Sequence, residues 1–325
     1  MDTFNWCFIG TGTLAEKVAK QLRAGGRHRI VSCYSRSKDG REKFARQFGA
    51  AACSSAGEAV TAPGVDAVYV VTPHNAHYRC VKTALEAGRP VLCEKAFTVT
   101  AAEAEELIDL AHEKGIYLCE AMWTWFSEGA RRAREWVLED RIGRIRSARF
   151  NYHANVTGYA PRVTDPKKAG GALLDVTVYP ITYAYRLWGM PVKVESRARL
   201  ENGIDLTDDI TLTFENGLRA QISASIIDNK GFEIMRLEGE RGRITAPFYH
   251  RVSFLTLRDF RGRGEVFRSR SIVNTYLEEF DIVADEIRRG LKESEYVPLR
   301  CTLDVMRILD TVRSQIGLEY DDLEQ

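Results

Sequence analysis

The chain has 325 residues, of which 45% are hydrophobic and 28% are charged, so it is long enough for two globular domains with substantial cores. The formal net charge of +1 gives no broad attraction to nucleic acid or to an anionic membrane surface. No apolar run approaches the length of a membrane span, and the first residues lack the basic and apolar segments of a signal peptide. We therefore expect a cytoplasmic protein with neither nucleic acid nor membrane among its partners.

The first apolar run, residues 6–9, ends in a Gly-x-Gly-x-x-Ala pattern, and a helical pattern covers residues 13–23. Gly10 permits a tight strand-to-helix turn, and Gly12, which has no Cβ, lets the backbone approach a pyrophosphate closely. The first-turn amides then face the phosphates with the positive end of the helix behind them. The spacing predicts a nucleotide-binding loop, with an ordinary glycine-rich turn as the alternative. The expected cofactor contacts are Gly10, Gly12, Thr13, Leu14 and Ala15.

Strand and helix patterns alternate through the next hundred residues. A near-continuous apolar run at 66–71 is typical of a parallel strand covered on both faces, and Thr100 with Glu103 forms a capping box that begins a helix. This alternation predicts an α/β fold with a doubly wound parallel sheet. The expected strands are 29–36, 66–71, 90–93 and 116–119, and the expected helices are 38–48, 76–86 and 100–114.

The pattern changes near Glu120, beyond which several segments alternate apolar and polar residues. The turn Glu215-Asn216-Gly217 indicates a hairpin, and the arginine-rich stretch 261–270 is expected to form a solvated hairpin. The second half is therefore predicted to be a mostly antiparallel sheet with helices on one face, which gives domains at 1–121 and 122–325. Its expected strands include 146–153, 210–214 and 218–226, and its expected helices are 127–139, 171–188, about 275–289 and 302–316.

Seven cysteines are present, and none of them lies in a Cys-x-x-Cys spacing. We interpret them as small buried hydrophobic residues of a protein in a reducing compartment. The sequence accordingly predicts neither a disulfide framework nor a metal site.

The end of the second strand carries Ser35-Arg36-Ser37, with no acidic residue before Asp39. A carboxylate at this point usually takes the ribose 2′-hydroxyl of NAD, and it would repel a 2′-phosphate. Arg36 could stack on adenine and pair with that phosphate, helped by the hydroxyls of Ser35 and Ser37. NADP(H) is therefore the expected cofactor, with NAD(H) left open and a plain surface arginine as the alternative.

Two further strand ends carry candidate cofactor contacts. Thr72, Pro73 and His74 follow the strand at 66–71, and His77 begins the next helix, where it could equally be a cap or a packing residue. The pair Glu94-Lys95 closes the strand at 90–93, where a charged pair is unusual unless something uses it. Lys95 could reach the nicotinamide end of a dinucleotide and stabilise alkoxide character on a substrate oxygen. A solvated ion pair is the alternative.

Asp175 and Tyr179 share one face of the helix expected at 171–188, because they stand four residues apart. Pro180 should kink this helix just after Tyr179. A carboxylate and a phenol beside a kink fit a substrate-binding wall. The alternative is that Tyr179 packs in a seam between domains and that Asp175 caps a helix or pairs with an arginine.

Taken together, these stretches resemble the glucose–fructose oxidoreductase/inositol dehydrogenase (Gfo/Idh/MocA) family, and the match runs nearly from end to end. The run 120–126 looks most like the branch that contains dimeric dihydrodiol dehydrogenase and NADP-dependent xylose dehydrogenase. The matching motifs are Gly10-x-Gly12-x-x-Ala15, Ser35-Arg36, Thr72-Pro73-x-x-x-His77, Ala84-Leu85-x-x-Gly88, Val91-Leu92-Cys93-Glu94-Lys95 and Gly170-Gly171-Ala172-Leu173-Leu174-Asp175-x-x-x-Tyr179-Pro180.

The resemblance implies an N-terminal Rossmann domain and a C-terminal α+β domain whose large open sheet often forms a dimer interface. A homodimer or higher homo-oligomer is therefore expected. The resemblance also implies that Lys95 is the family's catalytic lysine, that Tyr179 donates or accepts the proton, and that Asp175 is the acidic residue one turn earlier. The reading from the residues agrees, since it has Lys95 and Tyr179 facing one crevice from opposite halves of the chain.

The chain departs from the family pattern at four positions. Ala96 replaces a proline that would stiffen the turn after Lys95. Ala169 and Thr177 stand where glycines are common, and Trp125 stands where the dihydrodiol branch often has arginine. These changes affect the expected substrate more than the expected reaction.

The sequence thus predicts an NAD(P)-dependent oxidoreductase that transfers a hydride between nicotinamide and a carbinol or carbonyl carbon of a sugar, polyol or diol. The alternative is a non-catalytic NAD(P)-binding sensor or regulator on the same fold. A reductase for a linear tetrapyrrole or an amino-sugar intermediate is a third possibility, because a fold does not fix its substrate.

Overall fold

The computed structural model describes residues 3–158, 160–269 and 275–320. The chain forms two compact units: Met1–Trp123 with Asn274–Thr302, and Thr124–Val273 with Leu303–Gln325. The chain therefore returns to the first unit after it has built most of the second. The domain limits 1–121 and 122–325 remain a prediction. They divide the chain at one point, so they do not describe the later segment, residues 274–302, that belongs to the first unit.

The first unit contains a sheet of six parallel strands in the order β3-β2-β1-β4-β5-β6. The order reverses between β1 and β4, which confirms the predicted doubly wound sheet. In sheets of this kind, ligands bind at the carboxyl ends of the strands beside such a reversal. The strands are β1 (Phe4–Ile9), β2 (His28–Tyr34), β3 (Ala51–Ala52), β4 (Ala67–Val70), β5 (Val91–Glu94) and β6 (Leu118–Ala121).

Helices cover both faces of this sheet. Trp6 and Phe8 point to one face and pack against Phe280 of the late helix α8 (Thr275–Arg288). Ser32 faces the other way, where its hydroxyl donates to the carbonyl of Ala59 in α3 (Ala56–Val60). The remaining helices are α1 (Thr13–Gly25), α2 (Lys38–Phe48), α4 (His77–Glu86) and α5 (Ala101–Lys114), the last with the predicted capping box of Thr100 and Glu103.

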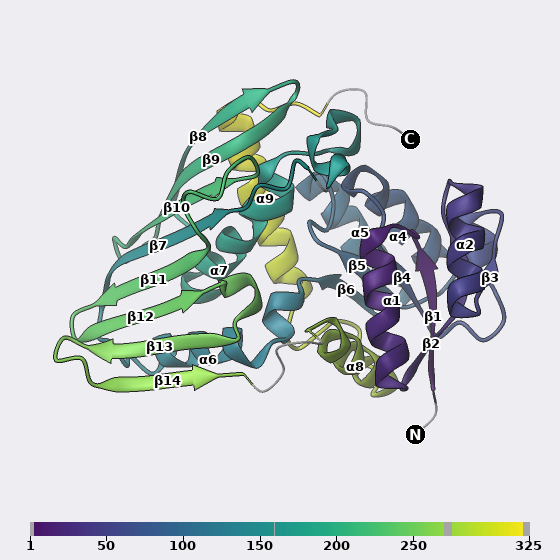
Figure 1. Ribbon diagram of the computed structural model, residues 1–325, viewed down its shortest axis with the longest axis horizontal. Coiled ribbons are helices and arrows are strands. Elements are labelled where there is room, and N and C mark those ends of the chain that lie inside the picture. Colours follow the sequence, from purple (N-terminus) through teal and green to yellow (C-terminus); the bar gives the residue numbers. More distant parts are fainter. Residues whose placement is uncertain (1–2, 159, 270–274, 321–325) are drawn as a thin grey trace. The chain divides into compact units, whose positions relative to one another are not determined.

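The second unit contains a sheet of eight strands in the order β14-β13-β12-β11-β7-β10-β9-β8 (Figure 1). Among the described strands of this second sheet, only the pairing of β7 with β10 is parallel, so the predicted, mostly antiparallel sheet is confirmed. The strands are β7 (Ile145–His153), β8 (Lys193–Glu201), β9 (Ile204–Thr213), β10 (Arg219–Ser225), β11 (Ile234–Gly239), β12 (Gly242–Pro247), β13 (Phe254–Asp259) and β14 (Gly264–Arg268).

The helices of the second unit gather on one face of its sheet, as Figure 1 shows. Helix α6 (Glu128–Leu138) packs on β13 and β14, and α7 (Val178–Trp188) packs on β7 and β10. Helix α9 (Leu299–Ile316) begins in the first unit and continues into the second. The opposite face of the sheet carries no described helix, so its alternate residues are exposed.

Both predicted hairpins form. The amide of Phe214 donates to the carbonyl of Leu218 across the turn between β9 and β10, and Gly217 adopts a φ of +79° there. Asp259 accepts the amides of Arg261 and Arg263 in the turn between β13 and β14, which the exposed arginines surround. The last residue of the predicted stretch, Arg270, lies outside the described residues.

All seven cysteines are buried, as expected for small hydrophobic residues. Within residues 3–158, 160–269 and 275–320, no helix is both long enough and apolar enough to cross a membrane.

Candidate functional site

The loop after β1 has two glycines with different physical reasons for their identity. Gly10 has a φ of +112°, and a Cβ there would overlap the carbonyl of Val71. A Cβ on Gly12 would meet no protein atom within 4 Å, so nothing inside the protein requires that glycine. An open position of this kind fits a ligand that approaches the backbone closely.

The N-terminus of α1 is left without a side-chain cap. Serine or threonine side chains accept a backbone amide at the start of α2, α3, α5 and α6, whereas the N-cap of α1 is Gly12 and has no side chain to do so. The first-turn amides of Thr13, Leu14 and Ala15 are therefore available to an anion, with the positive end of the helix dipole behind them. This arrangement fits the pyrophosphate of a dinucleotide.

The two serines after β2 hold the loop that carries Arg36. The Ser35 hydroxyl accepts from Thr11 Oγ1 at 2.8 Å and donates to the carbonyl of Ser37 at 3.1 Å. Ser37 in turn caps α2 through the amide of Gly40. Arg36 stands between them with an exposed side chain. No acidic residue replaces it at this strand end, so the loop fits a 2′-phosphate better than a 2′-hydroxyl.

His77 links the loops that follow β4 and β5. Its Nε2 lies 2.9 Å from the carbonyl oxygen of Thr72, and its Nδ1 lies 3.0 Å from that of Ala96. The ring is fully buried, and the buried ring of His74 meets it edge-on at 5.7 Å. His77 therefore packs in the interior, as expected if it is a packing residue rather than a cofactor contact. A contact between His77 and a cofactor remains a prediction.

Lys95 follows a carboxylate that the interior holds firmly. Glu94 is buried, Tyr69 Oη donates to its Oε1 at 2.5 Å, and the amide of Lys95 lies 3.3 Å from its Oε2. The Lys95 side chain itself is half-buried, and the Lys95–Ala96 peptide is cis. Glu94 and Lys95 therefore do not form the solvated ion pair that was the alternative expectation.

Two further carboxyl groups lie near Glu94 in the first unit. Glu120 lies in β6, one residue before the end of the strand, and is 3% exposed. It accepts hydrogen bonds from Thr302 Oγ1 at 2.9 Å and from the amide of Phe97. Glu279 of α8 is fully buried, and neither of its oxygens has a partner among the described residues.

Burial governs how these carboxyls titrate. It raises the pKa of Glu120 to about 7, against the opposing effect of the hydrogen bonds from Thr302 and Phe97. Burial, followed by the neighbouring charges of Glu94 and Glu120, raises the pKa of Glu279 well above its usual value. The sequence reasoning missed both groups. A single acid closing the apolar strand at Glu120 was a usable signal, whereas Glu279 is brought in by a distant helix.

In the second unit, Asp175 is buried and forms an ion pair with Arg162 Nη2 at 2.9 Å. This ion pair matches the alternative interpretation of Asp175, in which it pairs with an arginine. A direct contact of Asp175 with the substrate remains a prediction. Tyr179 is buried beside Tyr152 and His250, with ring centroids at 5.6 and 5.8 Å. The sequence reasoning missed these neighbours because separate strands and loops supply them.

The helix that carries Asp175 and Tyr179 is not uniform. A kink was predicted just after Tyr179, and the structure has a π-helical turn before it, at Leu173–Thr177. Pro180 has no N–H to donate to the carbonyl four residues earlier, and a wider turn accommodates that loss. Buried Asp205 accepts the amide of Leu173, and buried Asp208 accepts the Thr177 hydroxyl at 2.6 Å.

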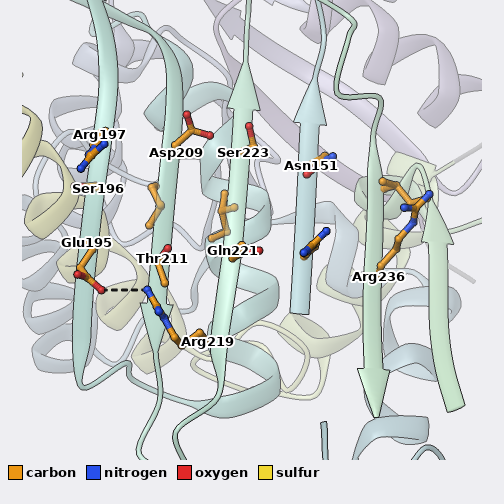
Figure 2. Close-up of a pocket in the computed structure, with 14 residues that line it drawn as sticks. Asn151, Glu195, Ser196, Arg197, Asp209, Thr211, Arg219, Gln221, Ser223 and Arg236 are labelled. Carbon is orange, nitrogen blue, oxygen red and sulfur yellow. Dashed lines mark ion pairs between the residues drawn. The ribbon is translucent and has the colours of Figure 1, made fainter. Parts of the chain in front are cut away.

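The exposed face of the eight-stranded sheet has a shallow hollow of its own (Figure 2). Its floor is polar and strongly charged, with Arg149 of β7 directly opposite Arg236 of β11 and with Glu195 3.7 Å from Arg219. None of the predicted catalytic or cofactor-binding residues lines it. Across the described parts of the chain, no group of three or more His, Cys, Asp or Glu residues could hold a metal ion.

Comparison with known proteins agrees with this geometry. Residues 4–121 match the oxidoreductase family with an NAD-binding Rossmann fold, and residues 130–245 match the GFO/IDH/MocA C-terminal domain. The chain is 29% identical to trans-1,2-dihydrobenzene-1,2-diol dehydrogenase of Mus musculus, covering 97% of each chain. It is 30% identical to D-xylose 1-dehydrogenase (NADP(+)) of Hypocrea jecorina, covering 99% of this chain and 94% of that one.

A solved structure shares the whole fold. It is a 3-ketoreductase from Actinomadura kijaniata with NADP, with a TM-score of 0.87 at 23% identity over 97% of this chain and 98% of that one. The family matches cover both halves of the sequence, and the relatives are matched over nearly their full length. The chain therefore belongs to the Gfo/Idh/MocA family of NAD(P)-dependent oxidoreductases.

Proposed function

We propose that this enzyme is an NADP(H)-dependent dehydrogenase or reductase acting on a CH–OH carbon, or the corresponding carbonyl, of a sugar, polyol or diol. The observation that best supports this function is the position of Lys95, which directly follows β5 at the carboxyl edge of the parallel sheet. The uncapped N-terminus of α1 lies at the same edge. The named activities of the mouse and Hypocrea relatives support a diol or pentose and favour catalysis over a sensor. The proposed cofactor contacts are Gly10, Gly12, Thr13, Leu14, Ala15, Ser35, Arg36, Thr72, Pro73, His74, His77, Glu94 and Lys95.

Each proposed catalytic group has a separate task. When bound, the nicotinamide cofactor supplies or accepts the hydride. The Lys95 ammonium donates a hydrogen bond to the substrate oxygen and stabilises its alkoxide character. The Tyr179 phenol gives that oxygen its proton or takes it away. Asp175, held by Arg162, orients the substrate or the phenol.

Turnover by variants tests these roles. The purified protein is mixed with NADP+ or NADPH and a panel that includes D-xylose, trans-1,2-dihydrobenzene-1,2-diol and their carbonyl counterparts, and nicotinamide absorbance is followed. Lys95→Met and Tyr179→Phe should each lower kcat by about 100- to 10,000-fold, the usual contribution of a positioned acid or base. NADPH binding, measured by fluorescence, should persist in Tyr179→Phe.

The matched control is Lys114→Met, which removes an exposed lysine at the end of α5. It should retain full activity. Full turnover by Lys95→Met would show that the lysine has no catalytic role. NADPH binding without turnover of any panel member would favour the sensor.

We also propose that the protein works in the cytoplasm as a homodimer or larger homo-oligomer, joined through the open face of the eight-stranded sheet. Arginines directly opposite each other, such as Arg149 and Arg236, repel within one chain. An isologous contact can bring acidic residues of a second copy, such as Glu195 and Asp209, to such a pair. The charge pattern of the hollow supports this face as the interface.

A further inference from the structure

The backbone that carries Lys95 is held by buried polar side chains from several elements of the first unit. His77 of α4 lies at hydrogen-bond distance from the carbonyl of Ala96, and Glu120 of β6 accepts the amide of Phe97. Two residues of the loop are thus held from different elements. Ala96 stands here in place of the proline that would stiffen this turn.

Glu120 does more than accept the amide of Phe97. It is 3% exposed, the positive charge of Lys95 favours its ionised form, and Thr302 of α9 donates to it. The nearby ionisable groups include Glu94 of β5, Glu279 of α8 and the thiols of Cys93 and Cys119, and the titratable ring of His77 of α4 holds the same loop at Ala96. The positive charge of Lys95 therefore adds to the hydrogen bonds from Thr302 and Phe97 in favouring the ionised carboxylate.

We propose that Glu120 is a positioning residue for Lys95, whose ionised carboxylate fixes the loop through Phe97 and supplies the negative charge that faces the ammonium. Glu279 stays protonated beside it, because three carboxylates in one dry interior repel one another. The inference rests on the proposed role of Lys95. It adds that the enzyme is most active when Glu120 is ionised.

The direction in which kcat/KM changes with pH follows from the charge of Glu120. Lowering the pH through the pKa of Glu120, about 7, neutralises the carboxylate and removes the charge facing Lys95. The kcat/KM of the wild-type protein should therefore fall on the acid side of about pH 7 and level off about tenfold lower, where Glu120 is protonated. Activity is measured with the fastest substrate of the panel and NADP+ or NADPH.

Thr302 offers a variant that leaves the lysine loop unchanged. Its hydroxyl hydrogen bond lowers the pKa of Glu120, so Thr302→Val should move the acid limb of kcat/KM upward by about one pH unit. Thr302→Ser keeps the hydroxyl and should leave the limb in its wild-type place. An unmoved limb in Thr302→Val would overturn the inference.

Glu120 itself offers the second test. Glu120→Gln keeps an acceptor for Phe97 but never carries a charge, so the acid limb should vanish and kcat/KM at pH 8 should fall about tenfold. Glu120→Asp should retain the limb. The exposed Glu113→Gln of α5 is the control and should match wild type. A wild-type profile in folded Glu120→Gln would contradict the proposal, with NADPH binding and thermal melting reporting the fold.

The two proposals fail in different ways. Full turnover by Lys95→Met removes the function proposed for that lysine. An inactive Lys95→Met together with an unmoved limb in Thr302→Val removes only the role of Glu120.

Discussion

Arg36 shows how one exposed side chain can decide between two cofactors. Its loop is held by Ser35 and Ser37, which hydrogen-bond to each other and to neighbouring backbone, while the guanidinium remains at the surface. A guanidinium pairs well with a phosphate and gains little from a ribose hydroxyl. The preference for NADP(H) should therefore depend on this residue.

We expect Arg36→Ala to weaken NADPH binding by about 10- to 100-fold, the value of one or two charge-assisted hydrogen bonds, and NADH binding by less than about threefold. Fluorescence titration of each cofactor measures both affinities. Arg29→Ala, which removes an exposed arginine of β2, is the control. Equal losses for the two cofactors would show that Arg36 does not read the 2′-phosphate.

At the scale of elements, the segment before Tyr179 depends on a tight backbone approach. Gly171 has a φ of +110°, and a Cβ there would overlap the carboxylate of buried Asp205, which also accepts the amide of Leu173. Ala169, two residues earlier, adopts a φ of +50° despite its Cβ. The chain thus keeps glycine where a side chain cannot fit and accepts modest strain where it can.

Substitutions at these two positions should differ strongly in their effect on stability. Gly171→Ala should lower the free energy of unfolding by about 2 to 4 kcal/mol, because the new methyl group meets a buried carboxylate and the backbone is strained. Ala169→Gly relieves a left-handed alanine but makes the unfolded chain more flexible, so it should change stability by at most about 1 kcal/mol. Urea denaturation followed by circular dichroism measures both. Equal stability of the two variants would contradict the steric argument.

At the scale of the whole molecule, the exposed sheet face should set the assembly. The charge reversal Arg236→Glu alters the charge of the polar hollow without touching the core, because this side chain is exposed. If copies meet through this face, the dissociation constant of the dimer should rise at least about tenfold, as expected for a wrong charge at an interface. Sedimentation equilibrium measures it.

Lys20→Glu, a reversal of an exposed charge on α1, is the control and should leave the assembly unchanged. A wild-type protein that sediments as a monomer at every concentration would remove the proposed interface. A dimer that tolerates Arg236→Glu would place the contact on another surface.

The sequence by itself determined the local features of this protein. The glycine loop at Gly10 and Gly12, the capping box at Thr100 and the hairpin at Gly217 were readable because each depends on residues close together in the chain. The doubly wound sheet followed from the alternation of strand and helix patterns, since that alternation permits few other arrangements. Membership of the oxidoreductase family followed from the order of these motifs.

Only the tertiary structure decided which distant groups meet. It brought Glu279 of α8 into the interior that holds Glu94 and Glu120, and it paired Asp175 with Arg162. These contacts join segments with no shared periodicity, so no local pattern indicates them. Burial then set the charge of each carboxyl, because water is excluded only after the layers have packed. The ionisation that we propose for Glu120 is therefore a property of the folded interior rather than of its sequence neighbours.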